Sequence, residues 1–144
     1  MSHQVTTSSS KGTVTSVNRI LLRGYVGANP TYRRFFNATL HPIDMWSFSL
    51  ATHRYAKKVG SLPLARETDW HTVKDFSTIN SGLYVDGSIR KGALVEVDGR
   101  IKYSKAADGS IYTQILPERV SVIRQAAWVS DSSLIFSSNQ TRAI

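Results

Sequence analysis

The side chains best suited to chemistry in this sequence are aromatic and basic residues that alternate along one segment. Trp70, Lys74 and Phe76 are separated by even numbers of residues, which in an extended strand places all three on one face. Unpaired bases stack on exposed aromatic rings, and a neighbouring lysine can contact the phosphates. Trp70 and Phe76 could instead belong to a hydrophobic core, but Lys74 on the same face argues against its full burial. The pattern therefore favours binding of a single-stranded nucleic acid.

A basic segment comes just before this strand. Residues 56 to 67 lack the periodicity of a strand and contain both Gly60 and Pro63, which predicts a long loop. Tyr55, Lys57 and Lys58 lie at its start, so we expect them to extend the nucleic-acid-binding surface.

Motifs for catalysis are missing from the sequence. It contains no H-E-x-x-H, no G-x-x-x-x-G-K-[ST] and no G-x-S-x-G, and its ten acidic residues are scattered. His41, His53 and His71 lie on different segments, so a metal or acid–base site would require a tertiary coincidence. The absence of cysteine excludes disulfides and thiolate chemistry. We expect neither an enzyme nor a cofactor or metal site.

Length and charge agree with a single basic domain. The chain has 144 residues, of which 41% are hydrophobic, and this suits one folded unit. Eighteen lysines and arginines against ten acidic residues give a net charge of +8, which favours a polyanionic partner, although the charge alone would also fit an ordinary basic protein. No apolar run is long enough to cross a bilayer, so we expect no membrane partner.

Short segments of alternating apolar and polar residues predict an all-β barrel or sandwich. Asn29 and Pro30 should end the first strand, residues 107–110 should form a hairpin turn, and residues 79–90 have only weak helix propensity because of Gly82 and Gly87. The expected strands are Asn18–Val26, Met45–Tyr55, Thr68–Ser77, Leu94–Tyr103 and Ile111–Leu116, with Val120–Ile123 closing the sheet.

Four segments carry a resemblance to a known family: residues 16–30 (SVNRILLRGYVGANP), 48–52 (FSLAT), 68–73 (TDWHTV) and 90–101 (RKGALVEVDGRI). In this order they resemble the motifs V-N-[KR]-V-x-L-x-G-x-[LV]-G-x-[DN]-P, F-[ST]-[LV]-A-T, T-x-W-H-x-[IV] and [RK]-K-G-x-x-[IV]-x-[VI]-x-G-x-[IL] of bacterial and mitochondrial single-stranded DNA-binding proteins. The resemblance extends over residues 16–124, which we expect to form the binding domain. Residues 1–15 are expected to be a disordered arm or leader remnant, and residues 125–144 a C-terminal tail.

The resemblance implies an all-β OB-fold, a five-stranded Greek-key barrel with one short helix and extended hairpin loops. It implies a homotetramer wrapped by single-stranded DNA, which protects the strand during replication beside proteins such as a polymerase or helicase. Trp70 and Phe76 would be stacking residues, Tyr55 and Tyr103 would replace tryptophans found in relatives, and His71 would lie at a subunit interface. Basic contacts are expected at Arg19, Arg33, Arg90, Lys91, Lys102 and Lys105.

The tail lacks the acidic tip found in bacterial relatives, which favours the mitochondrial type and a place in the mitochondrial matrix, at the nucleoid. Two alternatives remain: an OB-fold protein that prefers RNA, and an OB-fold subunit that binds only proteins. Tighter binding to oligo(U) than to oligo(dT) would indicate the first, and no salt-dependent binding to either would indicate the second.

Overall fold

The computed structural model describes residues 15–55, 60 and 65–127. Lys57 and Lys58 lie outside the described residues, as do most of the expected N-terminal arm and C-terminal tail. The elements are β1 (Ile20–Val26), β2 (Thr31–Phe36), β3 (Pro42–Tyr55), β4 (Arg66–Asp75), η1 (Thr78–Asn80), α2 (Ser81–Val85), β5 (Leu94–Lys105) and β6 (Ile111–Arg124).

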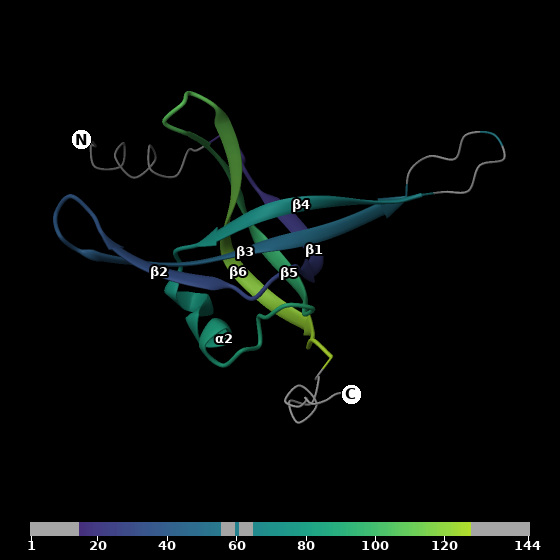
Figure 1. Ribbon diagram of the computed structural model, residues 1–144. Helices are drawn as coiled ribbons and strands as arrows, with labels where there is room; N and C mark the ends of the chain where they lie inside the picture. Colours follow the sequence, from purple (N-terminus) through teal and green to yellow (C-terminus); the bar gives the residue numbers. More distant parts are fainter. Residues whose placement is uncertain (1–14, 56–59, 61–64, 128–144) are drawn as a thin grey trace, which may run out of the picture.

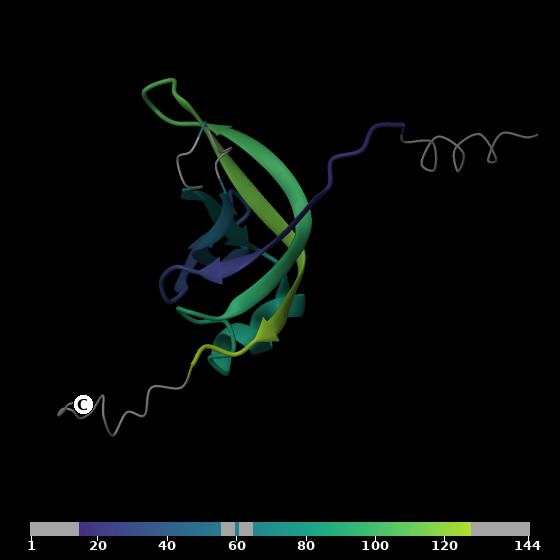
Figure 2. The same cartoon turned by 90° about the vertical axis from the view of Figure 1, so that its right-hand side faces the viewer.

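Five of the strands close into a barrel. β1 pairs with β5, β5 with β6, and β6 with β4 in parallel, while β4 pairs with β3 and β3 returns to β1. β2 adds a sixth strand on the free part of β3, and the β5–β6 hairpin projects from the barrel (Figures 1 and 2). The predicted all-β OB-fold with one short helix is therefore confirmed.

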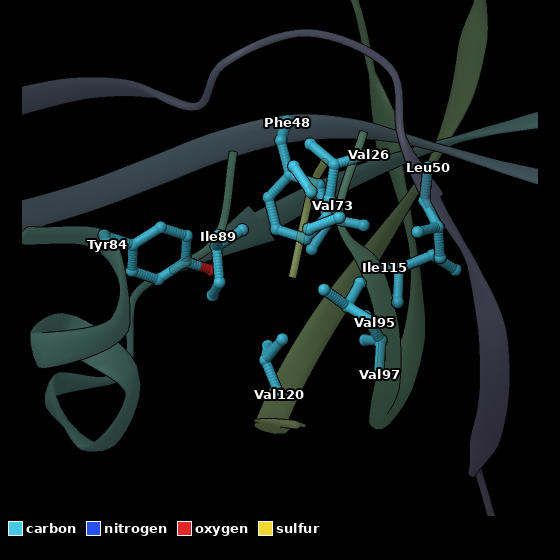
Figure 3. Close-up of a cluster of buried hydrophobic side chains, with 12 residues drawn as sticks. Val26, Phe48, Leu50, Val73, Tyr84, Ile89, Val95, Val97, Ile115 and Val120 are labelled. Carbon is cyan, nitrogen blue, oxygen red and sulfur yellow. The ribbon is translucent and has the colours of Figure 1, made fainter. Parts of the chain in front are cut away.

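Every barrel strand contributes to one hydrophobic core. Val26, Leu50, Val73, Val95 and Ile115 come from five different strands and are each at most 3% exposed. Their side chains point toward a common interior (Figure 3). Burial of one such side chain contributes about 1.5–3 kcal/mol, so the core fixes which face of each strand points outward.

A buried carboxylate fastens the helical segment to the barrel. Asp75 is 1% exposed and accepts hydrogen bonds from the Ser77 backbone N–H (2.8 Å), the Asn80 side-chain amide (2.9 Å) and the Tyr84 hydroxyl (2.7 Å). Asn80 in turn accepts from the backbone N–H of Val120 on β6 at 3.0 Å. These bonds hold η1 and α2 against one end of the barrel.

The last strand differs from the sequence prediction. The sequence pattern predicts separate segments at 111–116 and 120–123, on either side of Pro117, a residue that cannot donate a ladder hydrogen bond. In the structure β6 is continuous, and a register shift between Asp98 and Gly99 accommodates the proline. A Cβ atom on Gly99 would overlap the carbonyl oxygen of Leu116, so the close approach of the two strands depends on this glycine.

The sequence prediction missed β2 entirely and began β3 three residues late. All six residues of β2 are exposed, so neither face of this strand has the buried, apolar character that alternation detects. The strand exists because it pairs with the first part of β3, from Thr31 opposite Ser47 to Phe36 opposite Pro42.

Candidate nucleic-acid interface

The outer face of β4 carries the aromatic residues that the sequence singled out. Trp70 is 63% exposed and Phe76, just after the strand, is 45% exposed. Val73 and Asp75 point the other way and are buried, so the predicted division of this strand into two faces is confirmed. Lys74 shares the outer face and is partly exposed. We call Trp70, Lys74 and Phe76 the β4 platform.

The ring of Trp70 lies against the end of β1. A Cβ atom on Gly27 would come within 2.5 Å of Cζ3 of Trp70 and 2.7 Å of the Ser49 hydroxyl. A glycine is therefore required where the tryptophan ring rests. This contact holds one edge of the ring while most of the side chain stays open to solvent.

β2 adds an aromatic residue and a basic residue to the same face. Phe35 is 38% exposed and meets Phe76 edge to face, with 6.3 Å between ring centroids. Arg33 lies two residues before Phe35 and so points to the same side of β2. Arg33 was predicted and Phe35 was not, although the interleaving of aromatic and basic residues that identified the β4 platform also occurs here.

The β5–β6 hairpin stands beside Trp70. Tyr103, 69% exposed, lies opposite Thr113, and Thr113 shares a shallow pocket of about 100 Å³ with Trp70. Lys105 is two residues from Tyr103 and projects from the same face of the hairpin. Lys102 lies on the opposite face, since three positions separate it from Lys105. Tyr103 and Lys105 thus share the face of the hairpin that continues from the buried Ile115, and Lys102 lies on the other face.

At the far end of the β3–β4 pair, Tyr55 is 69% exposed and lies opposite Arg66. The neighbouring Arg54 pairs with Glu67 at 2.6 Å and with Asp69 at 3.3 Å. Tyr55 and Arg66 are therefore the exposed aromatic and basic groups of this extension.

Two further predicted contacts, Arg90 and Lys91, lie in the turn before β5. The backbone N–H of Lys91 donates to the side-chain oxygen of Asn29 at 2.9 Å, and Asn29 lies two residues after the glycine that supports Trp70. The Arg90 guanidinium reaches the carbonyl of Ala126 at 3.5 Å. The turn is thus tied to the β1–β2 connection next to the platform.

Arg19 has a different environment. Its guanidinium donates to both carboxylate oxygens of Asp98 on β5, at 3.2 and 2.9 Å. Arg23 donates from Nε and Nη2 to a single oxygen of Glu96, at 3.1 and 2.9 Å. Hydrogen bonding to Asp98 raises the pKa of Arg19 above its ordinary value. The charge of Arg19 is therefore balanced on the outer face of the β1–β5 pair.

His71 lies on the opposite face of β4 from Trp70. It is half-buried opposite Leu50, and its Nε2 atom is 2.8 Å from the hydroxyl oxygen of Thr52. One ring nitrogen of His71 is therefore hydrogen-bonded within the same barrel, to Thr52 on β3. Its role at a subunit interface stays a prediction.

Residues 15–55, 60 and 65–127 hold no group of three or more His, Asp or Glu residues that could bind a metal ion. This part of the chain also has no helix of the length and apolar character required to cross a membrane.

The closed barrel and its exposed aromatic and basic face define an oligonucleotide-binding barrel. Residues 17–122 match the model of the Single-strand binding protein family, so this chain belongs to that family. The resemblance inferred from the four sequence segments is confirmed.

Individual relatives agree with this assignment. The single-stranded DNA-binding protein of Rhizobium meliloti (strain 1021) is 34% identical over 95 residues, which cover 65% of this chain and 51% of the relative. The chain therefore spans about half the length of that protein. The mitochondrial single-stranded DNA-binding protein of Pongo abelii is 28% identical over 147 residues, covering 97% of this chain and 88% of the relative.

A solved structure has the same fold. The Plasmodium falciparum SSB complex with ssDNA superimposes with a TM-score of 0.61 at 27% sequence identity, covering 77% of this chain and 96% of that one.

Proposed function

We propose that this chain binds single-stranded DNA with little sequence preference and protects it during DNA replication, by binding rather than by catalysis. The observation that carries the proposal is the β4 platform, where two exposed aromatic rings flank a lysine on one face of a rigid strand. Membership of the Single-strand binding protein family and similarity to a structure titled as a complex with ssDNA support it.

The physical basis is stacking combined with charge. Every base has a flat π-face, so aromatic stacking contributes about 1–3 kcal/mol per base without reading the sequence. Trp70 and Phe76 supply two such surfaces, Phe35 extends the face beside Phe76, and Tyr103 offers a further exposed ring on the neighbouring hairpin. Basic side chains along this path, among them Lys74, can neutralise phosphates.

Equilibrium binding tests the proposal. Fluorescence anisotropy of labelled oligo(dT), oligo(U) and a duplex of equal length should show tightest binding to oligo(dT). The logarithm of the affinity should fall with the logarithm of salt concentration by about 0.7 per neutralised phosphate. Tighter binding to oligo(U) would replace the proposal with an RNA-binding role, and no salt-dependent binding to either strand would leave a protein-interaction subunit.

We propose further that the protein acts as a homotetramer. One barrel of this size offers a single short groove, so wrapping a long strand requires several grooves in a closed, symmetric set. His71 suits an interface because neutral imidazole can donate and accept without burying a charge. Light scattering should give four times the 16.0 kDa chain mass.

The variant His71→Glu introduces a charge at this position and should give dimers or monomers, whereas His71→Gln should remain tetrameric. Circular dichroism of both variants checks that the barrel is intact. A wild-type monomer, or a folded tetramer of His71→Glu, would reject the interface role.

We also propose a mitochondrial location at the nucleoid, with replication proteins such as a polymerase or helicase as partners. The similarity to a mitochondrial relative over 97% of this chain supports the location, while the bacterial relative matches a shorter part. A fluorescent fusion of the full chain should coincide with mitochondrial DNA in cells. Diffuse fluorescence throughout the cell would contradict this location.

A further inference from the structure

A cavity of about 390 Å³ lies between the β2–β3 hairpin and the segment formed by η1 and α2. Its volume is within the range of sites that hold small organic ligands. Three aromatic side chains line it, Tyr32, Trp46 and Phe76. Walls of this kind suit a flat aromatic ligand such as a nucleobase.

Phe76 connects this cavity to the β4 platform. The Phe76 ring contacts the ring of Phe35 on the outer face of β2, with 6.3 Å between the ring centroids. The same side chain lines the cavity on the inner side of the hairpin. A DNA strand that stacks on Phe76 therefore passes the mouth of the cavity, and one of its bases can turn inward.

The polar residues Asp44, Asp75, Ser77, Thr78 and Ser81 also line the cavity. Among them, the partly exposed Asp44 carboxylate could select a base. Its Oδ1 accepts from the Tyr32 hydroxyl at 2.6 Å and from Arg34 Nε at 2.7 Å, and its Oδ2 accepts from Arg34 Nη2 at 3.3 Å. A carboxylate has about four acceptor positions, so Oδ2 can accept one more hydrogen bond. The Asp44 side chain is 44% exposed, which leaves this position accessible.

The charge of Asp44 does not oppose the approach of DNA. Hydrogen bonds from Arg34 and Tyr32 hold the pKa of Asp44 below its ordinary value, so the group is ionised at neutral pH. Arg34 balances that charge locally. A second carboxylate that lines the cavity, Asp75, already accepts hydrogen bonds from Ser77, Asn80 and Tyr84, so Asp44 is the carboxylate with a free acceptor position.

We propose that this cavity receives one base of the bound strand and prefers a base with an exocyclic amino group: adenine, cytosine or guanine. The inference rests on the proposed binding of single-stranded DNA and adds a base preference at one position. An amino N–H can donate to Oδ2 of Asp44. Thymine has no amino group, and its one ring donor lies between two carbonyl oxygens that the carboxylate repels.

The test uses labelled oligo(dT) in which one central thymine is replaced by 2-aminopurine, a fluorescent base with an exocyclic amino group. The wild-type protein should bind this strand about tenfold more tightly than unsubstituted oligo(dT), because a hydrogen bond to a charged acceptor is gained. The fluorescence of 2-aminopurine should be quenched as the base stacks among the aromatic rings. Asp44→Asn should reduce the preference to less than twofold.

A matched pair of variants separates the cavity from the rest of the surface. Val85 lines the cavity and is 77% exposed, whereas Ile79 lies on the same helical segment, is 73% exposed and is absent from the lining. Val85→Trp should block the cavity and remove the preference while keeping the affinity for oligo(dT), and Ile79→Trp should leave both unchanged.

Equal affinity of the wild type for the two strands would overturn the inference, as would equal loss of the preference in Val85→Trp and Ile79→Trp. Binding to oligo(dT) would then still support the proposed function. Failure of the wild type to bind oligo(dT) at all would overturn the proposed function and, with it, the base preference.

Discussion

Replacement of Trp70 by leucine separates stacking from packing. Trp70 is 63% exposed, so only about a third of its surface, roughly 90 Å² of about 250 Å², contacts the protein. At about 25 cal/mol per Å², complete loss of these contacts would cost at most about 2 kcal/mol. Leucine keeps much of the apolar contact with Gly27, so we expect Trp70→Leu to lower the free energy of unfolding by less than about 1 kcal/mol.

The effect on DNA binding should be larger. Loss of one stacked base costs about 1–3 kcal/mol, which corresponds to about 5-fold to 150-fold weaker binding. Trp70→Phe retains an aromatic face and should restore most of the affinity. Phe48→Leu provides a second control, since Phe48 is 5% exposed and packs against the Tyr84 ring at 6.2 Å, so its loss should reduce stability more than binding.

Anisotropy of labelled oligo(dT) measures the affinity without relying on tryptophan fluorescence, and urea denaturation measures the stability of the same samples. A Trp70→Leu protein that loses several kcal/mol of stability but binds oligo(dT) as tightly as the wild type would refute this reasoning. Trp70 would then be a packing residue rather than a stacking surface.

Three other predictions concern charge, pH and backbone strain. Lys105→Gln should reduce the slope of log affinity against log salt concentration by about 0.7, the value for one phosphate. Lys102→Gln changes a lysine on the other hairpin face and should reduce this slope less, and salt titrations of the two variants measure the difference. Burial and the hydrogen bond to Asp75 raise the pKa of Tyr84, so the contribution of this residue to stability is complete below pH 10 and declines at higher pH. Tyr84→Phe should lower the free energy of unfolding by about 2 kcal/mol at pH 7 and remove this decline at alkaline pH, as measured by urea denaturation. Leu40 has a φ of 64° and is 79% exposed, so Leu40→Gly should raise the free energy of unfolding by about 1 kcal/mol, measured in the same way.

Much of the barrel could be predicted because its strands have one buried and one exposed face. In β1, the even-numbered residues Ile20 to Val26 face inward and Arg23 and Tyr25 face outward, as the alternation indicates. The hairpin turn predicted at residues 107–110 is present before β6. Gly109 adopts a φ of 90° there, a value that favours glycine.

Features that depend on pairing between distant segments could not be predicted. β2 has no buried face, so its presence follows only from its register with β3. The continuity of β6 through Pro117 depends on the missing side chain of Gly99 on the neighbouring strand. Local sequence contains neither relationship.

The positions of the candidate binding residues could also be predicted only in part. The shared face of Trp70, Lys74 and Phe76 follows from strand periodicity alone. Periodicity also places Lys102 and Lys105 on opposite faces of the hairpin, whereas the family resemblance predicts DNA contacts for both lysines.

The ion pair of Arg19 with Asp98 joins residues 79 positions apart, so no local pattern could indicate it. Only the register of β1 against β5 brings these two side chains together.

Photocrosslinking tests most directly whether single-stranded DNA lies on the β4 platform. Oligo(dT) containing 5-iodouracil crosslinks preferentially to aromatic side chains that stack on it, and trypsin should release Trp70 in residues 67–74 and Phe76 in residues 75–90. We predict that mass spectrometry finds crosslinks at Trp70 and Phe76 and that an excess of unlabelled oligo(dT) removes them. Crosslinks confined to Leu21 and Tyr25 on the outer face of β1 would contradict the account.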